Sequence, residues 1–433
     1  MASKPKFQSP TGMHDILPED QQYFAKIYEV VSEIADFYEF GKIDTPLLEE
    51  AELFSRGIGV STDIVKKEMY VFRTKGGDLL SLRPEFTAPI VRAYIEHGMQ
   101  NLSQPVKLWY FGPCFRYERP QAGRHRQFWQ FGFEILGEKS AAIDAQIIQI
   151  FYNVLKQLKL KNLIVEVNSI GDNQCRPYYK KLLANYFKTR EGSLCADCKR
   201  RVKENVLRIL DCKEEKCQPI KTQAPQILDH LCDECREHFK EVLEFLDEIS
   251  LPYKLNPYLV RGLDYYTKTV FEIFADKEEK ENETLVSPVS LVGGGRYDKL
   301  VKILGGRETP ASGAAAGIER IVELMKSQEV KITKPSQAQV FLAQLGVLAK
   351  KKSLKLVEDF RKANIKVAES LGKDSLKTQL SRANKIGARF TLIIGQEEAL
   401  SNKVIIRDMQ SGKQDVVKIE KIVDEVKKRL KKA

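Results

Sequence analysis

Residues 115–137, FRYERPQAGRHRQFWQFGFEILG, concentrate arginine, glutamate and aromatic side chains in one hairpin-length stretch. Guanidinium groups suit phosphates and carboxylates because their planar forks donate two parallel hydrogen bonds, and glutamates accept from amine or ring N–H donors. A solvated charged hairpin is the alternative interpretation. Gly132 and the neighbouring aromatic residues instead favour a covered surface that a ligand approaches closely. We therefore predict that this stretch holds an anionic or planar ligand.

Period-2 alternation divides the same stretch into two strands, each with two different faces. Arg116 and Glu118 share one face of the first strand. Gln130, Gly132 and Glu134 share one face of the second strand, opposite a row of aromatic residues. The pattern predicts a hairpin with one polar face and one face that packs into a core.

Two other segments place polar residues where they could line a site. In LRPEFTAP (82–89), Glu85 and Thr87 are expected on one face of a strand. In LVRGLDYYTKTVFE (259–272), Arg261 precedes a glycine, an aspartate and two tyrosines within an otherwise strand-like alternation. The second pattern is the more specific, because LRPEFTAP alone is typical of an ordinary strand end.

Two segments rich in small residues are less specific. GGGRYDKL (293–300) could cradle a phosphate or form a tight turn, and it lacks the lysine of the P-loop pattern. ASGAAAGIERIVELMKS (311–327) is expected to be a helix whose small residues allow close packing, followed by Glu319 and Arg320. A lone helical arginine is usually solvated, so the meaning of Arg320 depends on its neighbours.

The order of strand and helix patterns predicts an α+β fold with an antiparallel sheet flanked by helices. An amphipathic helix is expected over 18–38, and strands alternate with helices up to about residue 170. Strand patterns vanish over 171–252, which holds most of the cysteines, and return over 253–328. We predict that the cysteine-bearing segment is a mainly helical insertion between the two parts of one sheet domain, 1–170 and 253–328.

The C-terminal quarter differs from the rest of the chain in charge and pattern. After a polar linker near KITKPSQ, βαβα order predicts a small α/β domain over 338–433 with a mostly parallel sheet. From residue 337 onward there are 22 Lys and Arg and 11 Asp and Glu, a difference equal to the net charge of +11 of the whole chain. A basic domain on a neutral body indicates nucleic-acid binding, although a lysine-rich face can also serve solubility alone.

The sequence contains no apolar run long enough to span a membrane, and MASKPKFQSP at the N-terminus lacks the apolar core of a signal peptide. We therefore expect a cytoplasmic protein without a membrane partner, whose cysteines stay reduced.

Taken in order, several of these motifs resemble those of class II aminoacyl-tRNA synthetases. PLLEE after a long helix, FRYE with its arginine-rich loop, and GIERI are similar to motifs 1, 2 and 3 of that class. LVRGLDYYTKTVFE and GGGRYD resemble two stretches peculiar to histidyl-tRNA synthetases, and TGMHDILPED and LRPEFTAP match that family too. The resemblance spans essentially the whole chain and implies a C-terminal anticodon-binding domain. It further implies ligation of L-histidine to tRNA(His) with ATP and Mg²⁺, and a homodimer formed through motif 1.

The resemblance also implies site residues. The ATP-binding set is Arg116, Glu118, Arg124 and Arg320, with Arg116 on the α-phosphate, Glu118 near the adenine amine and the other two on the outer phosphates. The histidine-binding set is Glu85, Phe86, Thr87, Arg116, Gln130, Glu134, Arg261, Tyr265 and Tyr266. In that set Glu85, Thr87 and Gln130 would hold the α-amino group, and Glu134 with Tyr266 the imidazole. Arg261, between the carboxylate and the α-phosphate, and Arg116 would be catalytic.

The cysteines of the insertion predict a structural zinc site. Paired CxxC motifs in a reducing compartment are typical of tetrahedral zinc. The expected ligands are Cys195, Cys198, Cys232 and Cys235, with Cys212 and Cys217 between the pairs and His230 and His238 as weaker candidates. The alternative is that these cysteines simply pack in the insertion.

A non-catalytic paralogue is the main rival, for example the synthetase-like regulatory subunit of ATP phosphoribosyltransferase. That family lacks the anticodon-binding domain and tolerates loss of the ATP-binding arginines. In this chain Arg116, Arg124, Arg261 and Arg320 are present and the basic C-terminal domain is intact. These residues favour the catalytic interpretation.

Overall fold

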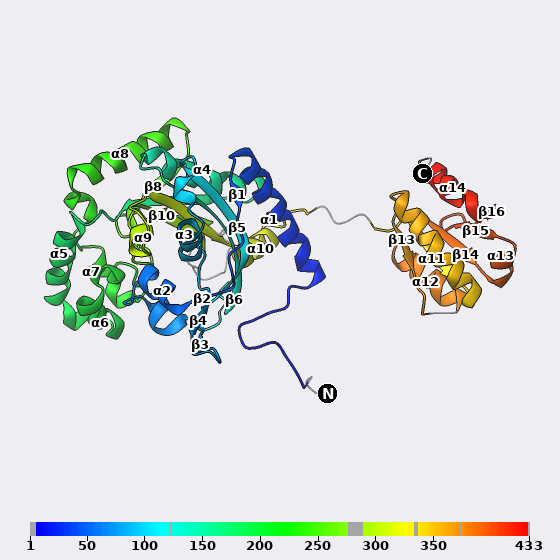
Figure 1. Cartoon of the computed structure of the whole chain (residues 1–433), viewed down its shortest axis with the longest axis horizontal. Coiled ribbons are helices and arrows are strands. Elements are labelled where there is room, and N and C mark those ends of the chain that lie inside the picture. The colour runs from blue at the N-terminus through cyan, green and yellow to red at the C-terminus, as the bar shows by residue number, and fades with distance from the viewer. Residues whose placement is uncertain (1–5, 122, 276–288, 333–336, 373–374, 432–433) are drawn as a thin grey trace. The chain divides into compact units, whose positions relative to one another are not determined.

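The computed structural model describes residues 6–121, 123–275, 289–332, 337–372 and 375–431. The chain forms two compact units, residues 1–332 and 333–433, which are each described by themselves (Figure 1). The expected linker near KITKPSQ coincides with the boundary between the units, and its residues 333–336 lie outside the described part of the chain.

An eight-stranded sheet forms the centre of the first unit, in the order β1-β5-β6-β11-β10-β9-β7-β8. The edge pairs β1–β5 and β7–β8 are parallel and the other pairs are antiparallel, which confirms the predicted antiparallel sheet. The bounds are β1 Gly41–Lys42, β5 Val106–Phe115, β6 Gln127–Leu136, β7 Leu163–Ser169, β8 Tyr253–Leu255, β9 Thr267–Ala275, β10 Val289–Arg296 and β11 Ala311–Gly317. A smaller sheet contains β2 Leu48–Glu50, β3 Val71–Arg73 and β4 Leu79–Leu82.

Helices pack against the large sheet because each has an apolar stripe. In α1 (Pro18–Phe37), Phe24, Ile27, Val31 and Ile34 recur at helical spacing and are buried. The same core includes residues of α4 and α10. The other helices of the sheet domain are shorter or line its second face, and the bounds are α2 Ala51–Ile58, α3 Thr87–Glu96, α4 Ala141–Gln157, α9 Leu300–Ile303 and α10 Ile318–Ser327.

The two faces of β6 confirm the period-2 prediction. Phe131 and Phe133 are fully buried in the core that α1 and α4 share. Gln130 and Gly132 belong to the opposite face, where Gly132 lies against the Tyr110 ring of β5. A Cβ at position 132 would meet Tyr110 Oη at 2.2 Å, so this glycine makes room for a protein side chain. The expectation that a ligand approaches the backbone there was therefore wrong.

The insertion is helical, as predicted. It contains α5 Arg176–Lys188, α6 Ala196–Glu204, α7 Gln218–Lys221 and α8 Asp233–Glu248, with short 3-10 turns between them. Figure 1 shows these helices grouped at one side of the first unit. Apolar residues of α5 and α6 share one core with β5, α3 and the segment before β9, and those of α8 join the core of α1 and α4, so the insertion packs directly on the sheet domain.

Three local predictions were wrong. Residues 311–317 form strand β11, because the sheet contacts on both sides override the helix propensity of alanine. The glycines of GGGRYD lie in β10, so they form neither a phosphate loop nor a tight turn. Glu85 and Thr87 do not share a strand: β4 ends at Leu82, and Thr87 is the first residue of α3.

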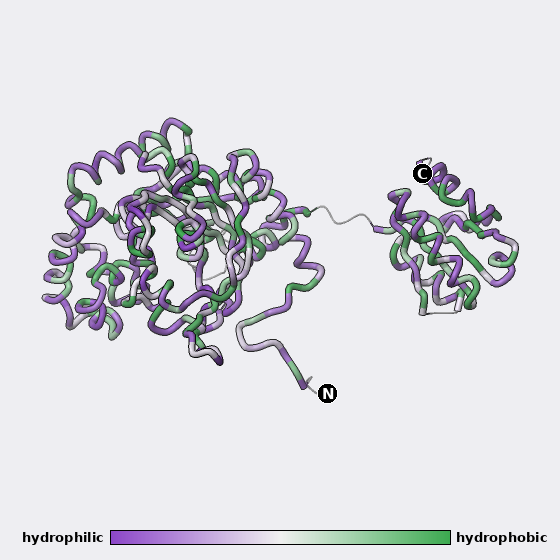
Figure 2. The backbone as a smooth tube through the Cα atoms, viewed as in Figure 1, coloured by the Kyte–Doolittle hydropathy of each residue, from purple (hydrophilic) through white to green (hydrophobic). Residues whose placement is uncertain are grey.

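The second unit is a sheet covered by helices, with the strand order β13-β12-β14-β15-β16. Its first two pairings are parallel and its last two antiparallel, so the sheet is mixed and not mostly parallel as predicted. Figure 2 shows apolar colour along its strands and alternating colour along its helices. The bounds are β12 Val340–Gln344, α11 Val347–Lys362, β13 Val367–Glu369, α12 Leu376–Lys385, β14 Phe390–Ile394, α13 Gln396–Leu400, β15 Lys403–Asp408, β16 Gln414–Lys418 and α14 Ile422–Leu430.

Among the described residues, we find no helix with the length and apolar character needed to cross a membrane.

Candidate active site

A cavity of about 920 Å³, measured out to its open mouth, lies on the face of the large sheet opposite α1 and α4. Its lining joins residues from β5, β6, β10, the N-terminus of α3, the segment before β9 and the N-terminus of α10. All the predicted histidine- and ATP-binding residues except Glu134 line it: Glu85, Phe86, Thr87, Arg116, Glu118, Arg124, Gln130, Arg261, Tyr265, Tyr266 and Arg320. Segments as far apart in the sequence as Glu85 and Arg320 thus converge on one pocket.

Arginines crowd one end of the cavity, beyond the β5–β6 hairpin. Arg116 lies 3.8 Å from the carboxylate of Glu118, and Arg124 lies 3.3 Å from it. Arg320 donates to the carbonyls of Gly123 and Ser290 at 3.0 and 2.7 Å. Burial lowers the pKa of Arg320, and the positive charges of Arg124 and Arg116 lower it further. Three guanidinium groups gathered at one end of a cavity offer several planar hydrogen-bonding forks, so this end suits a polyanion.

The N-terminus of α3 forms the opposite end of the cavity. Glu85 accepts hydrogen bonds from the backbone N–H groups of Thr87 and Ala88 at 2.6 and 2.8 Å, so its carboxylate caps the helix. Tyr265 donates to the same carboxylate at 3.4 Å. Burial raises the pKa of Glu85 although these bonds oppose the shift. A carboxylate so placed is suited to accept from an ammonium group, which would compensate its loss of hydration.

Glu134 lies beneath the cavity and does not line it. Its carboxylate is fully buried and accepts from Thr87 Oγ1 at 2.9 Å and from the hydroxyl of Tyr297. Burial raises the pKa of Glu134 to about 8. The structure thus connects Glu134 to the cavity through Thr87, whereas the resemblance implied a direct contact with the imidazole.

Arg261 projects over β10 in the middle of the cavity. It forms an ion pair with Glu272, and a Cβ at Gly293 would meet the Arg261 guanidinium at 2.2 Å. Gly293 is therefore the position in β10 over which this side chain lies. Within the described chain Arg261 Nε is buried without a hydrogen-bond partner, and so is the hydroxyl of Tyr110, which also lines the cavity. Unpaired buried donors are costly, so both fit a site that a ligand completes.

Comparisons with known proteins agree with this geometry. The model of the family "Histidyl-tRNA synthetase" matches residues 12–321, and that of the family "Anticodon binding domain" matches residues 339–429. The chain belongs to the histidyl-tRNA synthetase family. The histidine–tRNA ligase of Dehalococcoides mccartyi strain 195 is 45% identical over 98% of this chain and 100% of its own length. That of Caldanaerobacter subterraneus is 42% identical over 98% of this chain and 99% of its own length.

Solved structures give the same result for the fold. The apo histidyl-tRNA synthetase of S. aureus matches with a TM-score of 0.78 and 33% identity over 97% of this chain and 99% of its own. A Bacillus halodurans protein described as an ATP phosphoribosyltransferase regulatory subunit/histidyl-tRNA synthetase is 21% identical with a TM-score of 0.60, over 91% of this chain and 99% of its own. At that identity the second match concerns the fold alone, so the rival interpretation gains no support from it.

Several further residues in or beside this pocket belong to motifs or strand patterns that are visible in the sequence, although they were not predicted as site residues. Glu319 accepts from the backbone N–H of Trp129 at 2.8 Å, and burial raises its pKa to about 7. It stands next to Arg320 in GIERI. Tyr110 lies within the alternating pattern of β5, and Glu272 lies within that of β9. His125, the only histidine of the hairpin, also lines the cavity.

The expected zinc ligand set was wrong, because its two CxxC motifs do not meet. The described residues contain two separate groups that could hold a metal ion: Cys195, Cys198, Cys212 and Cys217; and Asp172, Cys175, Cys232 and Cys235. Each CxxC motif belongs to a different group. The Cys195/Cys198 motif is joined by Cys212 and Cys217, and the Cys232/Cys235 motif by Asp172 and Cys175, which the spacing did not suggest as partners. His238 belongs to neither group, since its Nε2 lies 2.8 Å from Asp144 in the core.

Proposed function

We propose that this chain joins L-histidine to tRNA(His) in two steps. The histidine carboxylate attacks the α-phosphorus of ATP in line, which forms histidyl-adenylate and releases pyrophosphate. The 3′-terminal ribose hydroxyl of the tRNA then attacks the carbonyl carbon of the adenylate and releases AMP. The convergence of a polycationic end and a carboxylate end in one cavity carries this proposal, alongside membership of the family.

In this proposal the arginine-rich end receives ATP. Arg116 contacts the α-phosphate, Glu118 accepts from the adenine amine, and Arg124 with Arg320 holds the outer phosphates. The gathering of Arg116, Arg124 and Arg320 at one end of the cavity supports this assignment. Fixed guanidinium groups stabilise the negative charge that develops on the α-phosphoryl oxygens without reorganising during the reaction.

The other end of the cavity receives histidine. Glu85, Thr87 and Gln130 hold the α-amino group, while Tyr266 contacts the imidazole and Glu134 supports Thr87 from beneath. Arg261 lies between these ends, where its unpaired Nε–H can bind the carboxylate as the guanidinium faces the α-phosphate. The residues therefore work mainly by positioning the two reactants and neutralising charge.

Magnesium is expected to enter with ATP, since Mg²⁺ prefers phosphate and carboxylate oxygens. Glu319 fits such an ion: it lines the cavity beside Arg320, and burial raises its pKa to about 7, a desolvation cost that a bound cation would offset. When bound, Mg²⁺ neutralises the outer phosphates; Arg116 and Arg261 orient the reacting groups.

Histidine-dependent ATP–pyrophosphate exchange tests the proposal. We expect exchange with L-histidine and none above background with the other amino acids, because a side chain without the polar ring nitrogens of imidazole would leave polar groups at the Tyr266 end of the cavity unpaired. Exchange with a different amino acid, or binding of histidine without exchange, would contradict it. The second outcome would instead favour a regulatory paralogue.

The partner and architecture of the protein extend this proposal. We propose that the basic second unit, which matches the anticodon-binding family, contacts tRNA(His) and that the protein works in the cytoplasm, where tRNA is charged. The first unit then divides into catalytic parts 1–170 and 253–328 and an insertion, 171–252. We also propose a homodimer: Phe37, Leu47 and Leu48 near motif 1 are 78, 45 and 40% exposed. A monomeric mass by light scattering would contradict the dimer.

A further inference from the structure

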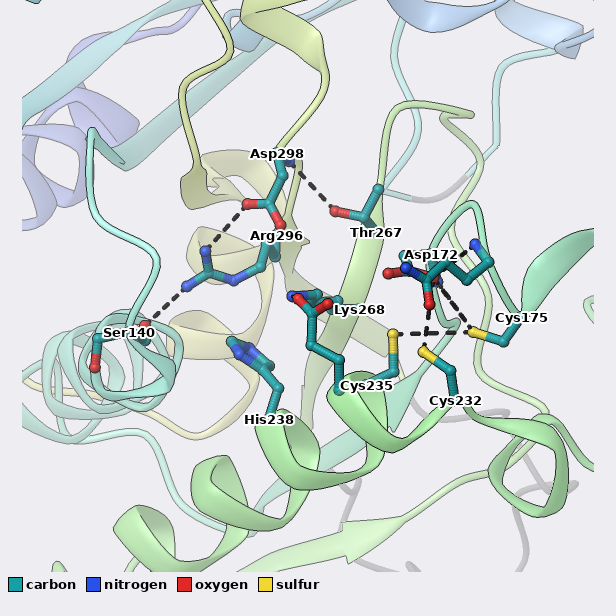
Figure 3. Close-up of polar contacts among 12 residues, drawn as sticks. Ser140, Asp172, Cys175, Cys232, Cys235, His238, Thr267, Lys268, Arg296 and Asp298 are labelled. Carbon is teal, nitrogen blue, oxygen red and sulfur yellow. Dashed lines mark hydrogen bonds and ion pairs between the residues drawn. The ribbon is translucent and has the colours of Figure 1, made fainter.

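Cysteines of the insertion converge on two points that the proposed reaction does not use. In the first group, the sulfurs of Cys195, Cys198, Cys212 and Cys217 lie within 4.8 Å of one another, and all four residues are buried. In the second group, an oxygen of Asp172 and the sulfurs of Cys175, Cys232 and Cys235 meet the same limit (Figure 3). None of these cysteines forms a disulfide.

We propose that each group binds one zinc ion and that the second ion fastens the base of the insertion to the strand that carries the histidine pocket. The first site has four thiolate ligands, and the second has three thiolates and one carboxylate. Both ligand sets are of the kind that closes a structural zinc site, with no position left for water.

The spacing of the first group fits a single tetrahedral ion. Zinc–sulfur bonds of about 2.3 Å at tetrahedral angles place neighbouring sulfurs about 3.8 Å apart. The sulfurs of Cys195 and Cys212 are 3.9 Å apart. The backbone N–H groups of Cys198 and Cys195 donate to the sulfurs of Cys195 and Cys217, each at 3.3 Å. Such donors stabilise thiolates, whereas simple packing of neutral cysteines does not require them.

The second group has the same features around a carboxylate. The sulfurs of Cys175 and Cys235 are 3.9 Å apart, and Asp172 Oδ1 lies 3.6 Å from Cys175 and 3.9 Å from Cys232. The N–H of Asp172 donates to the Cys175 sulfur at 3.3 Å. Figure 3 shows the three sulfurs and the carboxylate facing one another, with Lys268, which is ion-paired with Glu234, nearby.

Zinc is the occupant that these distances favour. A [4Fe–4S] cluster binds each of its four cysteines to a different iron, and a [2Fe–2S] cluster divides them between two irons, so neither gathers all four sulfurs around one point as they lie here. Calcium and magnesium prefer oxygen ligands, which only Asp172 could supply. Thiolates select zinc in a closed four-ligand site.

The second site joins the two ends of the insertion. Asp172 and Cys175 follow β7 directly, and Cys232 and Cys235 begin α8, which leads the chain back to the sheet. Next to Cys175, Arg176 donates to the backbone carbonyls of Ile170 and Tyr266. The first group, in contrast, links only α6 to the turns that follow it.

The same region connects to the start of β9. The N–H of Ile170 donates to the carbonyl of Lys268 at 2.8 Å, and the N–H of Lys268 donates to the carbonyl of Gly171 at 2.8 Å. Tyr266, which precedes this pair, lines the cavity. Loss of the second ion should therefore loosen Tyr266 and weaken histidine binding, a consequence that rests on the proposed function.

Metal analysis of the full-length protein tests the two sites. We expect about two zinc ions per chain in the unaltered protein and about one in each of the variants C217S and C232S. C114S, which removes a buried cysteine outside both groups, is the matched control and should keep about two. Less than about half an ion per chain in the unaltered protein, or loss of both ions in a single folded variant, would overturn the proposal.

Cobalt(II) titration of the metal-free protein decides the question if a variant fails to fold. Two equivalents should bind with the charge-transfer absorption of cobalt thiolates, and absence of that absorption would overturn the proposal. In pyrophosphate exchange, C232S should raise the KM for histidine severalfold while C217S leaves it nearly unchanged; equal effects would refute the link to the pocket. If the unaltered protein shows no exchange, the proposed function fails and the zinc count still stands.

Discussion

In the proposed reaction Arg261 contacts both reactants from the cavity wall, where its guanidinium lies over Gly293 of β10. We expect Arg261→Ala to reduce histidine-dependent ATP–pyrophosphate exchange by roughly 100-fold or more, as for loss of a group that stabilises transition-state charge. Thermal unfolding and tRNA binding should change little, because the side chain contacts the sheet only through Glu272 and the strand beneath it.

Arg56→Ala provides a matched control. This arginine lies on α2, its side chain is 64% exposed, and its partner Glu52 is on the same helix, so its removal should leave exchange unchanged. Near-normal exchange by the Arg261 variant would refute the role of Arg261 at the α-phosphate.

Glu134 predicts a dependence of stability on pH. Burial raises the pKa of Glu134 from 4.5 to about 8 in the folded protein. Between these values the folded state keeps a proton that the unfolded state has lost. The free energy of unfolding should therefore fall as pH rises, by at most about 1.4 kcal/mol per pH unit from this group.

Glu134→Gln isolates this contribution, because the neutral amide can accept from one of the two hydroxyls, Thr87 or Tyr297, and donate to the other, but does not titrate. Urea unfolding between about pH 5 and 7 should show a shallower decline of stability in the variant than in the unaltered protein. Identical slopes for the two proteins would show that Glu134 is ionised in the folded state.

The residues that sequence alone could place are those governed by a local period. Gln130 and Phe131 were assigned to opposite faces of a strand, and the structure confirms this. The position of Glu134 beneath the cavity depends on Thr87 and Tyr297, which are remote in sequence, so no local pattern contains it. The cysteine groups were mispaired for the same reason: proximity along the chain says nothing about which turns of the insertion meet.

Strand β10 carries two neighbouring glycines with different tasks. A Cβ at Gly293 would overlap only the mobile end of Arg261, whereas a Cβ at Gly294 would meet Ala314 Cβ at 2.2 Å and the carbonyl of Gly313 at 2.4 Å. We expect Gly293→Ala to lower exchange by roughly 10- to 100-fold, because it displaces Arg261, with little loss of stability. Gly294→Ala should instead destabilise the fold by about 1–3 kcal/mol, since strand backbones must move apart.

Urea unfolding and exchange measured on both variants check this pair of expectations, and each variant serves as the control for the other. The same effect on activity and on stability in both variants would show that the glycines only pack. Loss of stability confined to Gly293→Ala would reverse the assignment.

The helix wrongly predicted over 311–317 shows why elements rich in small residues are difficult to assign. Alanine favours helices, but β11 pairs with β6 on one side and β10 on the other. A Cβ at Gly313 would overlap the Glu134 carboxylate at 1.6 Å. Small residues are thus required in β11 because buried groups of the neighbouring strands occupy the space beside it. The local sequence pattern of β11 carries no information about those groups. Longer amphipathic segments such as α1 were predicted within one residue.

The order of domains was easier to predict than their internal topology. Charge and strand–helix order separated a basic C-terminal unit from a neutral body, and the chain divides into compact units at 332 and 333. The antiparallel pairing of β15 and β16 was not predicted. Two consecutive strands without a helix between them can pair with each other or lie at opposite edges of the sheet, and the sequence pattern does not distinguish these arrangements.

The charge of the second unit predicts a specific dependence on salt. Because the basic excess from residue 337 onward equals the net charge of the whole chain, phosphate contacts with tRNA should be concentrated there. We expect the KM for tRNA in aminoacylation to rise at least roughly tenfold between about 50 and 200 mM salt, through loss of counterion release. The KM for histidine in exchange should change less than about twofold, since the amino acid binds in a cavity shielded from bulk ions. A chain ending at residue 332 is the control, and its tRNA binding should depend less steeply on salt. Equal salt slopes for the two chains would place the phosphate contacts on the first unit instead.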